Sequence, residues 1–278
     1  MLHRGLPPTW ARMRRFIPFL AREPMVPVIR LSGTIMPAGR LGSGINDAAL
    51  EPVIERAFTR GKPAAVALLV NSPGGSPAQS SLIAGRIRRL AGEKRVPVHA
   101  FVEDVAASGG YWLACAADHI WVDETSIVGS IGVVSSGFGL HEFIGRHGIE
   151  RRVHTAGRSK SQLDPFRPED PEDVARLDRI LGELHETFIA HVRGRRGDRL
   201  GDGDLFTGEF WTGRRAVELG LADGVAHILP KMREICGKDV RLVPHGIRRG
   251  LLQRLGAQAI AGVADMIEER ALWARYGL

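Results

Sequence analysis

Short apolar runs of strand length alternate with segments of helical periodicity through the first part of the chain. Residues 26–31, 64–71 and 96–102 are predominantly apolar and predict strands. Between them, residues 45–60 and 77–91 carry apolar side chains at helical spacing. Strands separated by helices are typical of a parallel sheet that is covered by helices. This alternation restricts the fold to the α/β class.

The alternation continues further along the chain. Its later strands are predicted at residues 119–122 and 150–154, with a glycine-punctuated extended segment at 126–134. Its later helices are predicted at residues 111–117, 138–147, 172–193 and 211–219. The 278 residues suffice for one sizeable core, and the sequence has no internal repeat. We therefore expect one main domain at residues 26–229, between a basic amphipathic arm (1–25) and a basic helical tail (230–278).

Two glycine turns stand at predicted strand-to-helix junctions. In Asn71-Ser72-Pro73-Gly74-Gly75, adjacent glycines let backbone amides approach a substrate closely. In Ala106-Ala107-Ser108-Gly109-Gly110, small neighbours leave the serine hydroxyl accessible, and the amide of Gly109 can face an oxyanion. Taken alone, the first can be a plain tight turn, and Ser108 can be a helix N-cap. Together they offer what acyl transfer needs, which is one nucleophile and two donors converging on one oxygen.

A serine nucleophile also needs a base. The chain has ten histidines, but none stands in a compact glycine-flanked loop; His154 comes nearest, and each is interpreted as structural or exposed. Positive charge is carried almost everywhere by arginine, which cannot lose its proton in a protein. A desolvated lysine can lose its proton, and Lys160 lies in the otherwise arginine-bearing segment 155–161. Lys160 is therefore the candidate base, with a solvated loop lysine as the alternative.

Composition argues against several other classes of protein. Cys115 and Cys236 show neither a disulfide framework nor metal-ligand spacing, and the sequence has no phosphate-binding loop motif, so we expect no metal and no cofactor. Residues 1–23 mix arginines with apolar residues and lack the continuous apolar core of a signal peptide. No apolar run approaches the ~20 residues of a membrane-spanning helix.

Net charge leaves two interpretations of the chain ends. A formal charge of +7 and a pI near 10.1 suit nucleic-acid binding, but no motif supports it, and we expect no nucleic-acid partner. The positive charge is concentrated at both ends, which fits peripheral contact with an anionic membrane. A solvated or oligomer-contacting arm is the alternative.

Four motifs occur in the order found in a known family. They are Asn71-Ser72-Pro73-Gly74-Gly75, Ala107-Ser108-Gly109-Gly110-Tyr111, Gly129-Ser130-Ile131-Gly132-Val133, and Gly157-Arg158-Ser159-Lys160 with Pro165-Phe166. With these motifs, and with residues 210–216 and 220–223, the chain resembles signal peptide peptidase A and SohB-type peptidases over residues 26–226.

The resemblance implies a ClpP/crotonase-like fold, a superhelix of repeated β-β-α and βα units, here with a helical C-terminal extension. It implies that Ser108 is the nucleophile and Lys160 the general base, with Ser130 hydrogen-bonded to the lysine. It also implies that Gly75 and Gly109 are the oxyanion-hole donors. We expect an apolar substrate pocket beside them, lined by Gly74, Tyr111, Val128, Ile131 and Val133.

The resemblance also implies substrates, partners and a location. The expected substrates are peptides, such as cleaved signal peptides or other hydrophobic, membrane-derived peptides. The expected assembly is a homo-oligomeric ring, with an octamer as one option, in which Ser108 of one subunit meets Lys160 of the next. We find neither the family's membrane anchor nor the doubled domain of its longer members, and expect a cytoplasmic protein with, as an option, peripheral contact with the inner membrane.

Two other functions stay open from the sequence. A crotonase-type enzyme of the same fold would act on acyl-CoA thioesters through an oxyanion hole and would not need Ser108. A membrane-surface scaffold that pairs with stomatin-like proteins would not need a working site, and the intact Ser108 and Lys160 argue against it. Covalent labelling of Ser108 by a fluorophosphonate separates a peptidase from a crotonase-type enzyme.

Overall fold

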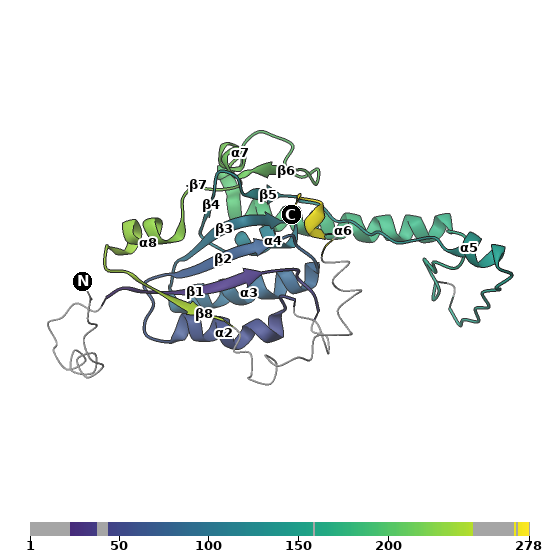
Figure 1. Cartoon of the computed structure of the whole chain (residues 1–278), viewed down its shortest axis with the longest axis horizontal. Coiled ribbons are helices and arrows are strands. Elements are labelled where there is room, and N and C mark those ends of the chain that lie inside the picture. The colour runs from purple at the N-terminus through teal and green to yellow at the C-terminus, as the bar shows by residue number, and fades with distance from the viewer. Residues whose placement is uncertain (1–22, 38–43, 158, 247–269, 271, 278) are drawn as a thin grey trace, which may run out of the picture.

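The computed structural model describes residues 23–37, 44–157, 159–246, 270 and 272–277. These residues form an eight-stranded sheet with helices packed along it (Figure 1). The strands are β1 (Met25–Ser32), β2 (Val66–Ser72), β3 (Val98–Ala107), β4 (His119–Val122), β5 (Ile127–Gly129), β6 (Phe210–Thr212), β7 (Gly224–Val225) and β8 (Arg241–His245). The helices are α2 (Asp47–Thr59), α3 (Pro77–Lys94), α4 (Gly109–Ala114), α5 (His141–Arg146), α6 (Pro171–Arg196), α7 (Gly213–Glu218) and α8 (Ile228–Cys236), with a 3-10 helix at Gly197–Arg199.

The long strand β3 changes partners along its length. The sheet order is β6-β5-β3-β2-β1-β8, with β4 beside β3 and β7 beside β4. The first half of β3 pairs with β4 and its second half with β5, so that Ala107 lies opposite Gly129. All pairings are parallel except that of β5 with β6. The exchange of partners brings β5 beside the end of β3, where Ser108 follows.

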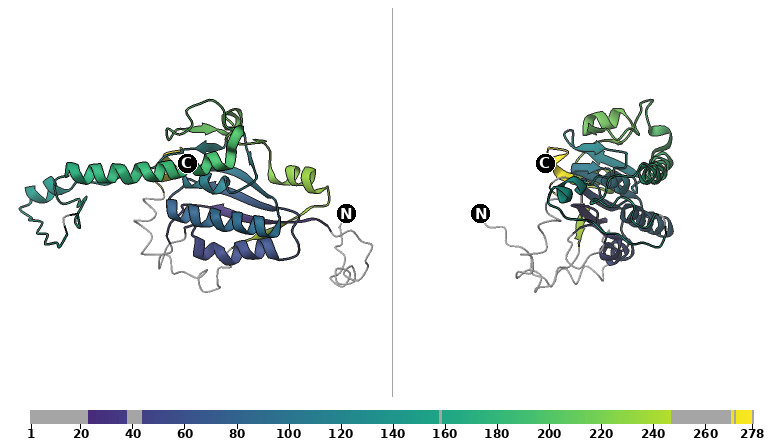
Figure 2. Two further views of the ribbon diagram at one scale, coloured as in Figure 1. Left: turned by 180° about the vertical axis from the view of Figure 1, so that it is seen from behind. Right: turned by 90° about the vertical axis from the view of Figure 1, so that its right-hand side faces the viewer.

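The main core lies between the sheet and the helices α2, α3 and α4. Figure 2 shows α2 and α3 side by side over one face of the sheet. Their apolar side chains, including Ile54, Ile83 and Ile87, are fully buried against strand residues such as Leu68 and Val98. Each such side chain contributes about 1.5–3 kcal/mol through burial. On the other face, a smaller cluster joins Met232 of α8 to Val26, Ala65, Ala67, Phe101 and Val240.

Three helices, α2, α3 and α6, begin where a side chain caps their unpaired first amides. The Asn46 side chain accepts a hydrogen bond from the amide of Ala49 at the start of α2 (2.9 Å). The Asp170 side chain does the same for Glu172 at the start of α6 (2.8 Å), where Pro171 occupies the first turn. Gly197, with φ of 54°, follows the end of α6. These local signals explain why the position of α6 can be predicted from the sequence.

Helix α6 has a packed half and a projecting half. Its buried residues, Phe188, Ile189, Val192 and Arg196, all lie in the C-terminal half. There His191 stacks on Trp112 of α4, and the ring of Phe188 packs against Trp112 at a tilt. The N-terminal half extends away from the sheet, and α5 lies at its far end (Figure 1). We call residues 134–187 the arm; α6 itself, with 26 residues, is about 39 Å long.

None of the helices in the described parts of the chain has both the length and the apolar surface needed to cross a bilayer. The longest, α6, carries charged residues along its whole length.

The structure differs from the sequence-based prediction at three places. Residues 150–154 form no strand, because they lie on the arm, away from any described strand with which they could pair. The helix expected at 211–219 begins only at Gly213, because Phe210–Thr212 pairs with β5 as β6. The tail boundary expected at residue 230 falls inside α8, and β8 pairs with β1, so the sheet continues to His245. The arginine-rich segments 1–22 and 247–269 lie outside the described residues.

Candidate active site

Ser108 lies at the turn from β3 into α4, in a backbone conformation that few non-glycine residues adopt. Its φ and ψ angles are 52° and −122°. Two backbone hydrogen bonds hold it there: its amide donates to Gly129 (2.8 Å), and its carbonyl accepts from Trp112 (3.0 Å). Such a conformation costs about 1–3 kcal/mol and is concentrated at functional sites. The half-buried hydroxyl makes no capping bond, although Ser108 occupies the N-cap position of α4.

The first glycine turn packs directly against this serine. A Cβ atom on Gly74 would lie 2.8 Å from Ser108 Cβ and 2.9 Å from the amide nitrogen of Gly109. A Cβ atom on Gly75 would lie 2.0 Å from the carbonyl oxygen of Ile35. Gly74 and Gly75 have φ angles of 107° and 136°, a region that favours glycine. Only glycine therefore allows the two turns to meet so closely.

Two backbone amides next to Ser108 are available to an incoming oxygen. Ile35 fixes the first turn, since its amide donates to Gly74 (2.8 Å) and its carbonyl accepts from Ser76 (2.8 Å). The amide of Gly75, between these bonds, has no acceptor among the described residues. Gly109 is the first residue of α4, where the helix itself offers its amide no acceptor. A Cβ atom on Gly109 would lie 3.4 Å from the Gly75 nitrogen, so the two predicted donors are neighbours.

Ser130 follows β5, directly after the residue whose carbonyl binds the Ser108 amide. It is largely buried, has a φ of 51°, and donates its amide to the carbonyl of Glu209 (2.6 Å). Its Oγ accepts a hydrogen bond from the hydroxyl of Tyr276 (3.3 Å), whose ring meets Phe210 edge-on. Tyr276 could not be predicted from the sequence, because no motif marks it and 146 positions separate it from Ser130.

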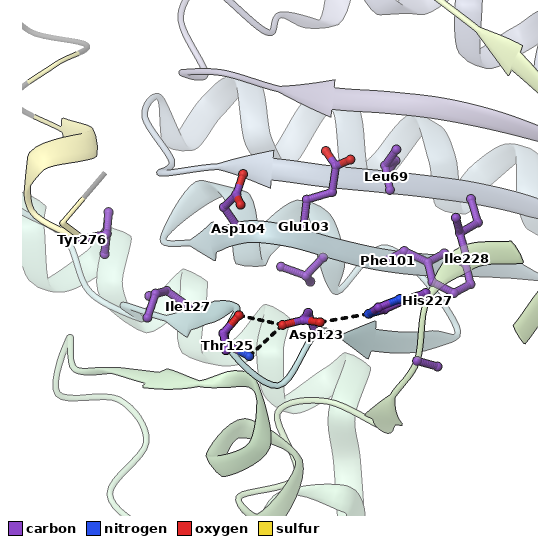
Figure 3. A pocket seen from close by; sticks show the side chains of 12 residues that line it. Leu69, Phe101, Glu103, Asp104, Asp123, Thr125, Ile127, His227, Ile228 and Tyr276 are labelled. Atoms are coloured by element: carbon purple, nitrogen blue, oxygen red, sulfur yellow. Dashed lines mark hydrogen bonds and ion pairs between the residues drawn. The ribbon is translucent and has the colours of Figure 1, made fainter. Parts of the chain in front are cut away.

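A cavity of about 560 Å³ lies beside Tyr276, with apolar and acidic walls (Figure 3). Hydrogen bonds from Thr125, and then from His227, lower the pKa of Asp123 to about 2.

Two other acidic residues of the cavity wall have partners: Glu103 pairs with Arg30 (2.7 Å), and Asp104 accepts a hydrogen bond from Asn71 (2.5 Å). The lining residues are Leu69, Phe101, Val102, Glu103, Asp104, Asp123, Thr125, Ile127, Ala226, His227, Ile228 and Tyr276. Within the described residues, no group of three or more His, Cys, Asp or Glu side chains is arranged to hold a metal ion.

The residues expected to line a substrate pocket have two different environments. Tyr111, Val128 and Ile131 are core residues without exposed surface, and the Tyr111 hydroxyl donates to the carbonyl of Leu221 (2.8 Å). These three side chains are therefore not open to a substrate in the single chain, contrary to the expectation from the sequence. Gly74 is buried against Ser108, and Val133 is half-buried.

Lys160 lies apart from the turn that carries Ser108. It is exposed, in the loop between α5 and α6, and this loop is at the far end of the arm, whereas α4 is in the body (Figure 1). One chain thus brings together Ser108, Gly75, Gly109 and the β5 end with Ser130, but not Lys160. Arg158, which belongs to the same motif as Lys160, is outside the described residues.

Comparison with known proteins identifies the family. The model of peptidase family S49 matches residues 91–231, half of the chain, and this range contains Ser108, Ser130 and Lys160. This chain belongs to peptidase family S49. The S49 assignment confirms the family resemblance that the four motifs predicted.

Two relatives of this S49 chain are longer proteins. One, from Brucella melitensis and named Na(+)/H(+) antiporter NhaA, is 48% identical over 286 residues, which cover 96% of this chain and 39% of that protein. The other, the probable protease SohB of Haemophilus influenzae, is 32% identical over 206 residues, covering 73% of this chain and 57% of that protein. The chain thus spans less than two thirds of the length of either relative.

A solved structure supports the fold of this S49 chain. The membrane-bound stomatin-specific protease 1510-N, in complex with a substrate peptide, superimposes with a TM-score of 0.52 and 14% identity. The match covers 84% of this chain and 97% of that one. The ClpP/crotonase-like fold class predicted from the sequence is confirmed.

Proposed function

We propose that this chain is a subunit of a serine peptidase in which Ser108 is the nucleophile and the amides of Gly75 and Gly109 form the oxyanion hole. The observation that carries the proposal is the nucleophile turn itself. It holds a serine hydroxyl that makes no capping bond beside two neighbouring amides that have no acceptor in the part of the chain that the structure describes. Preorganised donors of this kind stabilise the charge that develops on a carbonyl oxygen during acyl transfer.

The proposed reaction has two stages. Ser108 Oγ attacks the carbonyl carbon of a peptide bond while its proton passes to a neutral Lys160 amine. The oxyanion collapses, the C–N bond breaks, and the lysine returns the proton to the leaving amine, which leaves an ester on Ser108. A water molecule, deprotonated by the same lysine, then hydrolyses the ester and regenerates the serine. Ser130 Oγ, next to β5, is the group that we assign to hold the lysine amine in line.

The lysine of each site comes from a neighbouring subunit in this proposal. The arm carries Lys160 away from its own body and exposes many large apolar side chains, Phe138 with 86% of its surface among them. Large apolar side chains that gather on an exposed surface mark interaction sites. The exposed apolar residues of the arm are Val134, Phe138, Leu140, Phe143, Ile149, Leu163, Phe166, Ile180 and Leu184.

A second copy of the chain is the partner that fits this arm. If the arm of one copy packs on the body of the next, the contact is head-to-tail and can close into a ring, for which an octamer is one option. Packing against the neighbour would also desolvate Lys160, and burial favours the neutral amine that the reaction requires. The exposed lysine and the exposed apolar arm thus have one common explanation.

Hydrophobic, membrane-derived peptides are the substrates that we propose, cleaved signal peptides included. One relative is named as an antiporter, and 96% of this chain aligns with part of it. This alignment supports a location of the chain at or near a membrane. Peripheral contact between the basic chain ends and an anionic membrane is the accompanying proposal.

The test is the turnover of fluorogenic hydrophobic peptides by the wild type, Ser108→Ala, Lys160→Ala and a co-folded equimolar mixture of the two variants. We expect activity from the wild type, none from either variant alone, and about a quarter of the wild-type activity from the mixture, since a random ring joins an intact Ser108 to an intact Lys160 at one interface in four. Lys94→Ala, at another exposed lysine, is the matched control and should keep full activity.

Three results would contradict the proposal. Equal turnover by all four proteins would remove the peptidase assignment. Acyl-CoA turnover by Ser108→Ala, with no fluorophosphonate labelling of the wild type, would favour a crotonase-type enzyme. Liposome binding without any peptide cleavage by the wild type would favour a scaffold. A fourth result bears on one part of the proposal only: an inactive mixture of the two variants would exclude a site shared between subunits but would not contradict the peptidase assignment.

A further inference from the structure

One carboxylate organises the loop that carries Lys160. Asp164 Oδ1 accepts a hydrogen bond from the amide of Phe166 (3.0 Å), and Asp164 Oδ2 accepts one from Nε of Arg151 (3.2 Å). The side chain of Asp164 is only 8% exposed, although the loop around it faces solvent. Arg151 lies before Lys160 in the chain and Asp164 lies after it, so the ion pair connects the two segments that flank Lys160.

Other contacts strengthen the same connection. The guanidinium of Arg151 lies 5.8 Å from the ring centroid of Phe166, within the range of a cation–π interaction. The carbonyl of Pro165 accepts a hydrogen bond from the amide of Leu140 (2.6 Å). The amide of Arg167 donates to the carbonyl of Asp164 (3.1 Å). Every one of these bonds is made by Asp164 or by a residue close to it in the chain.

No hydrophobic core holds this loop in place. None of the residues described between 151 and 170 is buried, and the amide of Lys160 bonds only locally, to the carbonyl of Gly157 (3.3 Å). Where packing is missing, the position of a loop depends on its polar contacts. The contacts of Asp164, together with the hydrogen bond that the Arg167 guanidinium donates to the hydroxyl of Ser161 (3.3 Å), therefore set the position of the lysine relative to the arm.

We propose that Asp164, through Arg151 and the amide of Phe166, is a positioning residue that holds the Lys160 loop for catalysis in the neighbouring subunit. The inference rests on the proposed function, because it assigns the ion pair to the subunit that supplies the base. Asp164 acts only through the loop. Misplacing a catalytic group by about 1 Å can lower the rate about 100-fold.

The decisive experiment places Asp164→Asn on one subunit of the mixed assembly at a time. In co-folded mixtures, the Ser108→Ala chain supplies only the lysine, and the Lys160→Ala chain supplies only the serine. Asp164→Asn on the lysine-supplying chain should lower kcat for the peptide about 10- to 100-fold with little change in KM. The same substitution on the serine-supplying chain should leave the activity of the mixture unchanged.

Glu150→Gln is the matched control. Glu150 pairs with Arg152, two residues away, and both side chains are well exposed (2.6 Å; 69% and 75%). Its loss removes an arm ion pair that does not involve the loop, so it should have no effect from either chain. Arg151→Gln on the lysine-supplying chain should reproduce the Asp164→Asn effect, and the two together should cost little more than either alone.

The outcomes separate this inference from the proposed function. If the mixture without Asp164→Asn is active, and Asp164→Asn lowers activity equally from both chains, the residue acts on assembly or folding and the inference is wrong. Activity that is unchanged when Asp164→Asn is placed on either chain overturns the inference too. An inactive starting mixture, beside an active wild type, instead removes the shared site, and the inference falls with it. Size-exclusion chromatography of each mixture reports whether the assembly is intact.

Discussion

The nucleophile turn and the tip of the arm are held in position by different forces. Around Ser108, backbone segments meet so closely that side chains at Gly74 or Gly75 would overlap their neighbours, and the strand behind the turn is buried. Around Lys160, the chain is exposed, and polar contacts centred on Asp164 replace packing. The first region is complete within one chain. The second is ordered locally and, in our proposal, acts in a neighbouring subunit.

The largest expected effect comes from breaking the nucleophile turn. In Gly75→Ala the new methyl group would collide with the carbonyl of Ile35, so the backbone must move and the Gly75 amide with it. Losing one oxyanion-hole donor lowers kcat about 100- to 1000-fold. Peptide turnover measures this, with circular dichroism to establish that the variant is folded.

Gly85→Ala is the control for that substitution. A Cβ atom on Gly85, inside α3, would meet nothing within 4 Å. This variant should keep its activity and gain up to about 1 kcal/mol of stability from higher helix propensity. Full activity in a folded Gly75→Ala protein would show that the Gly75 amide is not a donor.

An intermediate effect is expected from the exposed apolar side of the arm. Phe138→Ser should weaken subunit association by about 2 kcal/mol, which is roughly a 30-fold higher dissociation constant, if Phe138 is a central contact. The melting temperature of the dissociated subunit should not change, because Phe138 is exposed there. Light scattering coupled to size exclusion gives the mass of the assembly.

Leu82→Ser provides the comparison on the body. Leu82 is also exposed, but it lies on α3, outside the arm. It should leave the assembly intact. Equal dissociation by both substitutions would mean that the arm has no special role in association.

The smallest expected effect is a pH dependence where the arm meets the body. Burial, helped by the charge of Arg195, lowers the pKa of His191, which stacks on Trp112 and lies 3.1 Å from its carbonyl oxygen. Below about pH 6.5 the unfolded chain binds a proton that the folded chain does not, so stability falls until the folded pKa is reached. His191→Gln should reduce the stability difference between pH 7.5 and pH 5.5.

Thermal denaturation at the two pH values measures this difference. His99, whose pKa is also lowered mainly by burial, lies in β3 and provides the comparison within the body. If His191→Gln and the wild type lose the same stability on acidification, His191 does not account for the pH dependence.

The sequence predicted the elements that depend on short-range signals. The three central strands are largely apolar runs, and the capped helices α2, α3 and α6 follow from local periodicity. It missed β6, β7 and β8, because short strands at the ends of a sheet have weak patterns and are defined by their partners. It placed a strand at residues 150–154 because alternation alone does not reveal that this segment leaves the body.

The candidate site divides in the same way. The turns that contain Ser108, Gly75 and Gly109 could be predicted, because each turn is a short motif of consecutive residues. The position of Lys160 could not, because it depends on how far α6 projects beyond its packed half. The contacts of Tyr276 with Ser130, and of Asp164 with Arg151, join residues 146 and 13 positions apart and carry no sequence signal of their own.

The projecting half of α6 has a consequence for how such a peptidase would respond to its own concentration. A subunit that left the proposed assembly would retain both Ser108 and Lys160 but could not bring them together. Activity per subunit would therefore fall on dilution, and the rate would rise more steeply than in proportion to total protein. Newly made subunits would be harmless until enough had accumulated to associate. Proteolysis would then be switched off by disassembly, without a separate inhibitor.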